Sequence, residues 1–307
     1  MAHGRGDRRL SARGRRVNVR LRRVLLAAVA LAALPAAQAA LVEESFELPV
    51  DVVDAYRKQI SRTIVVTVFV DDETPAPRPV LVLNHGRSGS PSGRAAVGRS
   101  RYPEASAWFA RQGFAVAVPT RIGYGVTGGE DVEDTGACQR KNYPPGYAAA
   151  AEQVLAVLKA MHARPDVAPE RAVIAGQSYG GATAIAVAAR QPAGMVAAIN
   201  FAGGGGGNPQ GSPRRPCMPH QLERLFAGYG ETARLPTLWV YTENDLYFGA
   251  THPRRWFEAF RAAGGQGEFV QFPPHGNDGH MLFTAYPQAW QPVVAAFLRR
   301  QGFEIRE

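Results

Sequence analysis

The sequence predicts an α/β fold with a mostly parallel central sheet, helices on both faces and two loop insertions near a candidate active site. Short apolar and β-branched runs alternate with Ala-rich stretches of helical length, which is the pattern of βαβ units. Polar or glycine-rich motifs directly follow several of these runs. The chain has 307 residues, 46% of them hydrophobic, which is enough for one large core.

Seven strands of four to eight residues are expected, and they cover residues 63–70, 80–83, 114–118, 172–175, 196–201, 237–241 and 268–272. Five helices carry apolar residues at helical spacing, and they cover residues 105–112, 147–162, 178–190, 256–263 and 292–301. The insertions are residues 125–145 and 202–234. The second begins with Gly203 to Gly207. No Gly-Lys-Ser/Thr follows it, so we interpret it as a flexible loop and not as a phosphate cradle.

The N-terminal segment accounts for most of the positive charge. Residues 1–39 hold nine Arg and one Asp, which is +8 of the formal net charge of +9. The apolar stretch 24–34 is followed by Pro35 and Ala37-Gln38-Ala39, the pattern of a cleaved signal peptide. It is about half the length of a membrane span, which argues against a retained anchor. We therefore expect a single domain over residues 40–307 that is exported to a periplasm or outside the cell. Its charge near zero argues against a nucleic-acid partner.

Export changes the interpretation of the two cysteines, Cys138 and Cys217, because oxidising compartments let disulfides persist. Both lie in Gly/Pro-rich parts of the two insertions. We expect them to pair; the alternative is two independent thiols.

The candidate nucleophile is Ser178, in Gly176-Gln177-Ser178-Tyr179-Gly180 between an expected strand and an expected helix. A sharp strand-to-helix turn strains the backbone at the serine and needs glycines on both sides. The alternative is a plain Gly/Ser turn, which the flanking strand and Ala-rich helix make a poorer interpretation.

A serine hydroxyl needs a histidine base and an acid that orients it, and in this type of fold both follow in the chain. The acid is predicted to be Asp245, at the end of the strand 237–241, with Glu243 as its competitor and Asp278 weaker. The base is predicted to be His280, with His275 as the alternative.

Charge on the attacked carbonyl oxygen requires backbone donors, which we expect from the N–H groups of Tyr179 and Arg87. His85 is expected to be a structural histidine that shapes the turn before Arg87. A substrate pocket is expected to be lined by Tyr124, Tyr143, Tyr179, Tyr247 and Phe248, with core packing as the alternative.

The run 81–86, the elbow around Ser178, the acid turn 238–245 and Asp278-Gly279-His280 resemble the α/β-hydrolase superfamily. Within it the chain is similar to the dienelactone-hydrolase-like and prolyl-oligopeptidase-like branch. The resemblance implies hydrolysis of an ester or related acyl bond through an acyl-enzyme, without a metal or organic cofactor. Dienelactone hydrolases proper carry a cysteine where this chain has Ser178. Prolyl-oligopeptidase relatives usually carry a propeller, which the residues before Thr63 are too few to form.

The function predicted from the sequence is therefore an exported serine esterase acting on a small-molecule ester or acyl substrate. A peptidase or amidase with the same triad is the alternative, and a non-catalytic binding protein of this fold is a third. The oligomeric state is left open.

Overall fold

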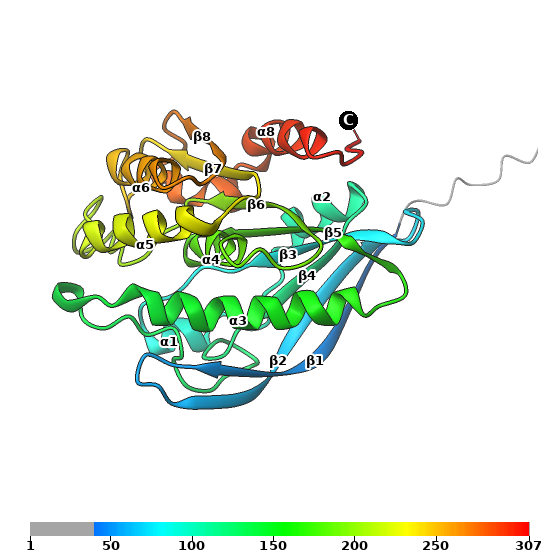
Figure 1. Cartoon of the computed structure of the whole chain (residues 1–307), viewed down its shortest axis with the longest axis horizontal. Helices are drawn as coiled ribbons and strands as arrows, with labels where there is room; N and C mark the ends of the chain where they lie inside the picture. The colour runs from blue at the N-terminus through cyan, green and yellow to red at the C-terminus, as the bar shows by residue number, and fades with distance from the viewer. Residues whose placement is uncertain (1–39, 307) are drawn as a thin grey trace, which may run out of the picture. The chain divides into compact units, whose positions relative to one another are not determined.

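The central element is an eight-stranded sheet in the order β1-β2-β4-β3-β5-β6-β7-β8 (Figure 1). The structure is a computed structural model, and it describes residues 40–306. β1 pairs with β2 and β2 with β4 in antiparallel register, and all other neighbours are parallel. The strands are β1 (Leu41–Val53), β2 (Gln59–Asp71), β3 (Arg78–Asn84), β4 (Ala115–Thr120), β5 (Val167–Gln177), β6 (Met195–Phe201), β7 (Thr237–Thr242) and β8 (Gly267–Phe272).

Helices cover both faces of this sheet. They are α1 (Pro91–Ala95), α2 (Pro103–Arg111), α3 (Tyr143–His162), α4 (Tyr179–Ala188), α5 (Pro219–Thr232), α6 (Thr251–Ala262), α7 (Leu282–Ala285) and α8 (Pro287–Arg300), with 3-10 turns at η1 (Cys138–Arg140) and η2 (Gly279–Met281). Apolar residues of α3, α4, α5 and α6 pack into one core, and those of α2, α7 and α8 pack into another. Figure 1 shows α3 on one side of the strands, with α2 and α8 on the other.

Alternation along the buried strands fills these two cores. In β3, Val80 and Val82 belong to the first core, whereas Leu81 and Leu83 belong to the second. All four side chains are fully buried, as expected for a parallel strand covered on both faces. This explains why the central strands are continuous apolar runs in the sequence.

All seven expected strands and all five expected helices are present, and the mostly parallel α/β architecture is confirmed. Among the strands and α-helices, four were not predicted: β1, α5 and the short helices α1 and α7. β1 forms the edge of the sheet and buries little beyond Val50 and Val52, so its sequence is too polar to stand out. α5 lies inside the second insertion, where the Gly/Pro-rich residues before it hid a helix that begins at Pro219.

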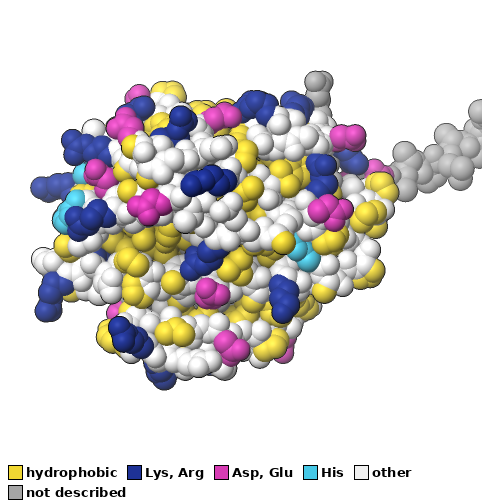
Figure 2. Space-filling view, in the orientation of Figure 1, with side chains coloured by type: hydrophobic (Ala, Val, Ile, Leu, Met, Phe, Trp, Pro, Cys, Tyr) yellow, Lys and Arg dark blue, Asp and Glu magenta, His cyan; other side chains and the backbone are white. Residues whose placement is uncertain are grey.

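The predicted signal peptide, residues 1–39, lies outside the described residues. Within residues 40–306, no helix has the length and apolar character needed to cross a bilayer. On the face in Figure 2, basic and acidic side chains are interspersed, and neither sign dominates.

Candidate active site

Ser178 lies in a strained turn between β5 and α4. Its backbone has φ 58° and ψ −124°, a region that residues with a side chain rarely adopt. The Ser178 N–H donates to the Phe201 carbonyl at 2.8 Å, which fixes the turn against β6. The strain expected for a nucleophile elbow is therefore present.

The two glycines around Ser178 are required by close backbone contacts. A Cβ on Gly176 would lie 2.2 Å from the Gly180 carbonyl oxygen, and one on Gly180 would lie 2.3 Å from the Asn84 carbonyl oxygen. No side chain fits at either position. This is the packing reason for the Gly-x-Ser-x-Gly pattern.

His280 and Asp245 are joined by a buried hydrogen bond. His280 Nδ1 lies 2.9 Å from Asp245 Oδ2, and the two residues are 3% and 0% exposed. The other carboxylate oxygen, Oδ1, accepts from the N–H groups of Tyr247 at 2.7 Å and Phe248 at 2.9 Å. The carboxylate is thus held by the backbone on one side and is free to orient the imidazole on the other.

The residues that were alternatives to Asp245 and His280 have other surroundings. Glu243 is exposed, and the His275 ring bonds to the Pro273 carbonyl. Asp278 accepts from the N–H groups of Leu246 at 2.9 Å and His280 at 3.0 Å. Asp278 therefore links the two loops that carry Asp245 and His280, a role that the sequence analysis did not assign to it.

The ring of His280 is enclosed by the aromatic residues that follow the acid. Tyr247 stacks on it with ring centroids 4.0 Å apart, and Phe248 meets it edge-on at 5.3 Å. In residues 40–306 the Ser178 hydroxyl makes no hydrogen bond, to His280 or to any other group. Such bonds are commonly long before substrate binds.

The loop after β3 lies directly against Ser178. A Cβ on Gly86 would be 3.2 Å from Ser178 Cβ, so only glycine lets the loop approach this closely. Within the described chain, neither the Arg87 N–H nor the Tyr179 N–H has a hydrogen-bond acceptor. Two backbone donors without a partner thus flank the serine, as the oxyanion-hole prediction requires.

A buried ion pair supports this loop from behind. Arg121 and Glu133 are both fully buried, with Nε and Oε1 2.5 Å apart. Arg121 also donates to the His85 carbonyl at 2.9 Å, and its backbone N–H donates to His85 Nε2 at 3.1 Å. Burial and the Arg121 charge hold the pKa of His85 well below its usual value, so this histidine is neutral and structural, as expected.

One prediction for a side chain near this loop, that of Tyr124, needs correction. Tyr124 lines no cavity beside Ser178, because its ring is fully buried and its hydroxyl donates to Glu133 at 2.7 Å. The Arg87 guanidinium is bound by Asp131 through two contacts of 2.6 Å, so it is already paired. The sequence signal that was overlooked is the group of acids at 130–134 inside the first insertion.

A second hydrogen-bond path joins the two halves of the site. The Gly86 N–H donates to the Tyr102 hydroxyl at 3.3 Å, and that hydroxyl donates to Gln177 Oε1 at 3.2 Å. Gln177 Nε2 then donates to the His280 carbonyl at 3.3 Å. The residue before the nucleophile therefore connects the oxyanion loop to the histidine loop.

Two cavities meet at Ser178. The larger has a volume of about 1100 Å³ and is lined by His280, Met281, Val97, Ser100 and the arginines 87, 99 and 101 among others. The smaller has a volume of about 260 Å³ and is lined by Tyr179, Tyr143, Phe248 and Lys141 among others. Tyr247 borders both. Apart from Tyr124, each aromatic residue predicted to line a pocket therefore does so.

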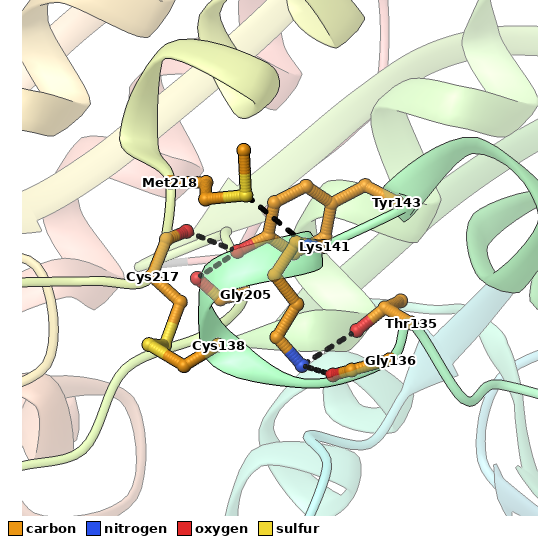
Figure 3. Close-up of a disulfide and its surroundings, with 8 residues drawn as sticks. All are labelled: Thr135, Gly136, Cys138, Lys141, Tyr143, Gly205, Cys217 and Met218. Atoms are coloured by element: carbon orange, nitrogen blue, oxygen red, sulfur yellow. Dashed lines mark hydrogen bonds between the residues drawn. A yellow bond between two sulfur atoms is a disulfide. The ribbon is translucent and has the colours of Figure 1, made fainter.

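The disulfide forms a wall of the smaller cavity. Cys138 and Cys217 are bonded, with Cα atoms 5.0 Å apart, which confirms the predicted pairing (Figure 3). The bond ties the two insertions together. Beside it, Tyr143 donates to the Cys217 carbonyl at 2.6 Å, and Lys141 donates to Thr135 Oγ1 at 3.0 Å.

The glycine run of the second insertion has a packing role, which corrects its interpretation as a flexible loop. Gly203, Gly204 and Gly205 are buried. A Cβ on Gly204 would lie 2.8 Å from the Trp256 ring, and one on Gly206 would lie 2.3 Å from the Tyr143 hydroxyl. The run is glycine because aromatic side chains press against it from several sides.

Residues 40–306 contain no cluster of three or more His, Cys, Asp or Glu side chains suited to hold a metal ion.

Comparisons with known proteins agree with this fold. Over residues 72–290 the chain matches the dienelactone hydrolase family. A dienelactone hydrolase-like promiscuous phosphotriesterase from metagenomic libraries is 18% identical with a TM-score of 0.54, covering 86% of this chain and 99% of that one. An acetyl xylan esterase from Paenibacillus sp. R4 is 19% identical with a TM-score of 0.56, covering 84% and 88%.

A third similar structure is an acylaminoacyl peptidase from Pyrococcus horikoshii, which is 14% identical with a TM-score of 0.60. The match covers 88% of this chain and 43% of the peptidase chain. No curated protein matches the sequence.

The fold is that of the α/β-hydrolases, with a mostly parallel sheet and a serine turn at the end of β5. The chain belongs to the dienelactone hydrolase family, and it is a hydrolase.

Proposed function

We propose that this protein is a serine esterase in which Ser178, His280 and Asp245 form a catalytic triad. Ser178 Oγ attacks the ester carbonyl while His280 Nε2 takes its proton, and Asp245 holds the imidazole in the required tautomer. The N–H groups of Tyr179 and Arg87 stabilise the oxyanion. The tetrahedral intermediate expels the alcohol, which takes the proton from His280. Water then cleaves the acyl-enzyme by the same steps in reverse.

The observation that carries this proposal is the 2.9 Å bond between His280 and Asp245 beside the cavity that contains Ser178. A fully buried carboxylate is costly unless it is paired and hydrogen-bonded, and the partners of Asp245 are the His280 ring and two backbone N–H groups. The strained serine and the two N–H groups without acceptors add to it, because each is a feature that catalysis needs and packing does not.

The experiment is hydrolysis of p-nitrophenyl acetate, butyrate, hexanoate and octanoate by residues 40–307, beside the Ser178→Ala variant. Turnover by the wild type with a fall of several orders of magnitude in the variant supports the proposal. Equal activity of the two proteins contradicts it. Ser88→Ala is a matched control, because Ser88 lines the same cavity outside the triad.

A peptidase or amidase that uses the same residues is the second candidate, favoured by the likeness to the acylaminoacyl peptidase. It must protonate a poorer leaving group with the same His280. Parallel assays of an ester and the anilide of the same acyl group separate the two functions.

We also propose that the protein is exported. The support is the leader-like segment before Ala40 together with the disulfide, which persists in oxidising compartments. N-terminal sequencing of the protein recovered from the periplasm or medium tests this. An N-terminus well before residue 40 in the recovered protein contradicts it.

A further inference from the structure

The two cavities that meet at Ser178 differ in which catalytic group they contain. His280 lines only the larger cavity, and Tyr179 lines only the smaller one. Ser178 and Arg87 border both. A substrate carbonyl at Ser178 therefore has one substituent on the His280 side and the other on the Tyr179 side. The inference below rests on the proposed esterase function.

Proton transfer decides which substituent goes where. The leaving alkoxide must receive its proton from His280, so its oxygen has to lie within hydrogen-bond reach of the imidazole. That requirement places the alcohol part of the ester in the larger cavity. The acyl part remains attached to Ser178 during the second half of the reaction, and it is then left in the smaller cavity.

We propose that the smaller cavity is the acyl pocket, closed by the Cys138–Cys217 disulfide, and that the larger cavity receives a bulky, hydrogen-bonding alcohol. With this arrangement of cavities, the enzyme removes short acyl groups from large polar alcohols. The ratio of the two volumes, about 260 Å³ against about 1100 Å³, sets the direction of that preference.

The walls of the smaller cavity are fixed by covalent and hydrogen bonds. The disulfide joins one insertion to the other across it, and Gly206 lies so close to Cys217 that its Cβ would be 3.0 Å from that of the cysteine. The Tyr143 hydroxyl, at the start of α3, donates to the Cys217 carbonyl and so holds the loop that carries this cysteine (Figure 3). A long acyl chain directed at this wall is therefore expected to meet the disulfide.

The larger cavity is suited to an alcohol with several polar groups. Ser88, Asn208 and Gln210 line it with polar side chains. Arg99 and Arg101 also line the cavity and share one carboxylate, Glu43, so they retain donors for a ligand.

The test crosses two variants with two substrate series. The acyl series is p-nitrophenyl acetate to octanoate, and the alcohol series is phenyl, 2-naphthyl and 4-biphenylyl acetate, whose leaving phenols are similar in acidity. Cys138→Ala with Cys217→Ala opens the smaller cavity, and Lys141→Ala widens it with the disulfide intact. Val97→Trp fills the larger cavity; Val97 is 38% exposed and lies outside the catalytic residues.

Opening the smaller cavity is expected to raise the octanoate-to-acetate ratio of kcat/KM about tenfold and to leave the alcohol series unchanged. Val97→Trp is expected to lower the 4-biphenylyl-to-phenyl ratio about tenfold and to leave the acyl series unchanged. The matched control is Val126→Trp, at a valine 56% exposed that lines neither cavity. The reversed pattern, or ratios that no variant changes, would overturn the assignment.

A third comparison tests the polar alcohol. The wild type is expected to hydrolyse a 6-O-acetyl methyl glucoside about tenfold better than cyclohexylmethyl acetate, and Arg101→Gln is expected to reduce that ratio. An equal rate for the two acetates overturns the polar preference. A wild type that hydrolyses no ester at all overturns the proposed function itself, which is a different result from a reversed pattern of ratios.

Discussion

The two ends of the active-site cleft each contain a buried histidine, and the two histidines have opposite surroundings. His280 has a carboxylate on Nδ1, and its ring borders the cavity. His85 has the Gly86 carbonyl on Nδ1 at 2.7 Å and the Arg121 N–H on Nε2 at 3.1 Å. Both nitrogens of His85 are therefore occupied by the protein, whereas Nε2 of His280 is left for chemistry.

The difference shows what makes a histidine a base. A carboxylate behind the ring stabilises the imidazolium that forms during proton transfer. A cation beside the ring opposes it, and Arg121 lowers the pKa of His85 in addition to burial. Burial is similar for the two residues, so their different partners are what distinguish the catalytic prediction for His280 from the structural prediction for His85.

The largest expected effect separates the two histidines directly. His280→Ala is predicted to lower kcat for p-nitrophenyl acetate by about 10⁴- to 10⁶-fold, because the base is lost. His85→Ala is predicted to lower Tm and to reduce kcat far less. Steady-state rates and thermal unfolding measure both. Equal losses of kcat in the two variants would remove the distinction.

The next effect concerns the carboxylate behind His280. Asp245→Asn is predicted to lower kcat by about 10⁴-fold, because the amide favours the wrong tautomer of the imidazole. Asp278→Asn is the matched control at a carboxylate that bonds only to backbone N–H groups. It is expected to retain most of kcat. If Asp278→Asn were the more severe change, the choice of acid would be wrong.

At the other end, the buried ion pair is predicted to matter for stability. Glu133→Gln leaves the Arg121 charge buried without a partner and should lower the free energy of unfolding by about 3 to 5 kcal/mol. Glu130→Gln, which breaks an exposed pair with Lys58, should change it very little. Urea unfolding of both variants tests this, and similar midpoints would contradict it.

The disulfide joins the two insertions that border the smaller cavity, and it also restricts the unfolded chain. Reduction with dithiothreitol is predicted to lower the free energy of unfolding by about 2 to 4 kcal/mol through the entropy of the unfolded chain. The variant without both cysteines, with and without reductant, controls for side effects. A wild-type Tm that reductant leaves unchanged would count against this contribution.

The smallest effect is a pH dependence of stability from His85. Its pKa is depressed in the folded protein, so the unfolded chain takes up the proton first as the pH falls. The stabilisation is complete above about pH 6.5 and is lost below it, by about 1.4 kcal/mol for each pH unit. His85→Gln should flatten this slope between pH 6.5 and 5. Thermal unfolding across that range measures it.

Much of the fold could be predicted from the sequence because central parallel strands are covered on both faces and must be apolar throughout. β1 was missed because an edge strand need not be apolar throughout. α5 was missed because the segments on either side of it are rich in turn residues. The serine turn could be predicted because its glycines are a local steric need, with Gly176 and Gly180 in backbone contact.

The sequence by itself determined the order of the candidate catalytic residues along the chain: a serine after one strand, an acid after a later strand and a histidine near the C-terminus. Only the tertiary structure decided which partners each side chain has. Asp278 and Asp245 are both near His280, but only Asp245 bonds to its ring. Asp278 is instead held by the N–H groups of His280 and of Leu246, which is 32 residues away in the chain. Tyr124 and Glu133 likewise belong to a buried network with Arg121, which only the packing of their loops shows. Contacts between residues far apart in the chain depend on how helices, strands and loops pack, and the local sequence pattern does not predict them.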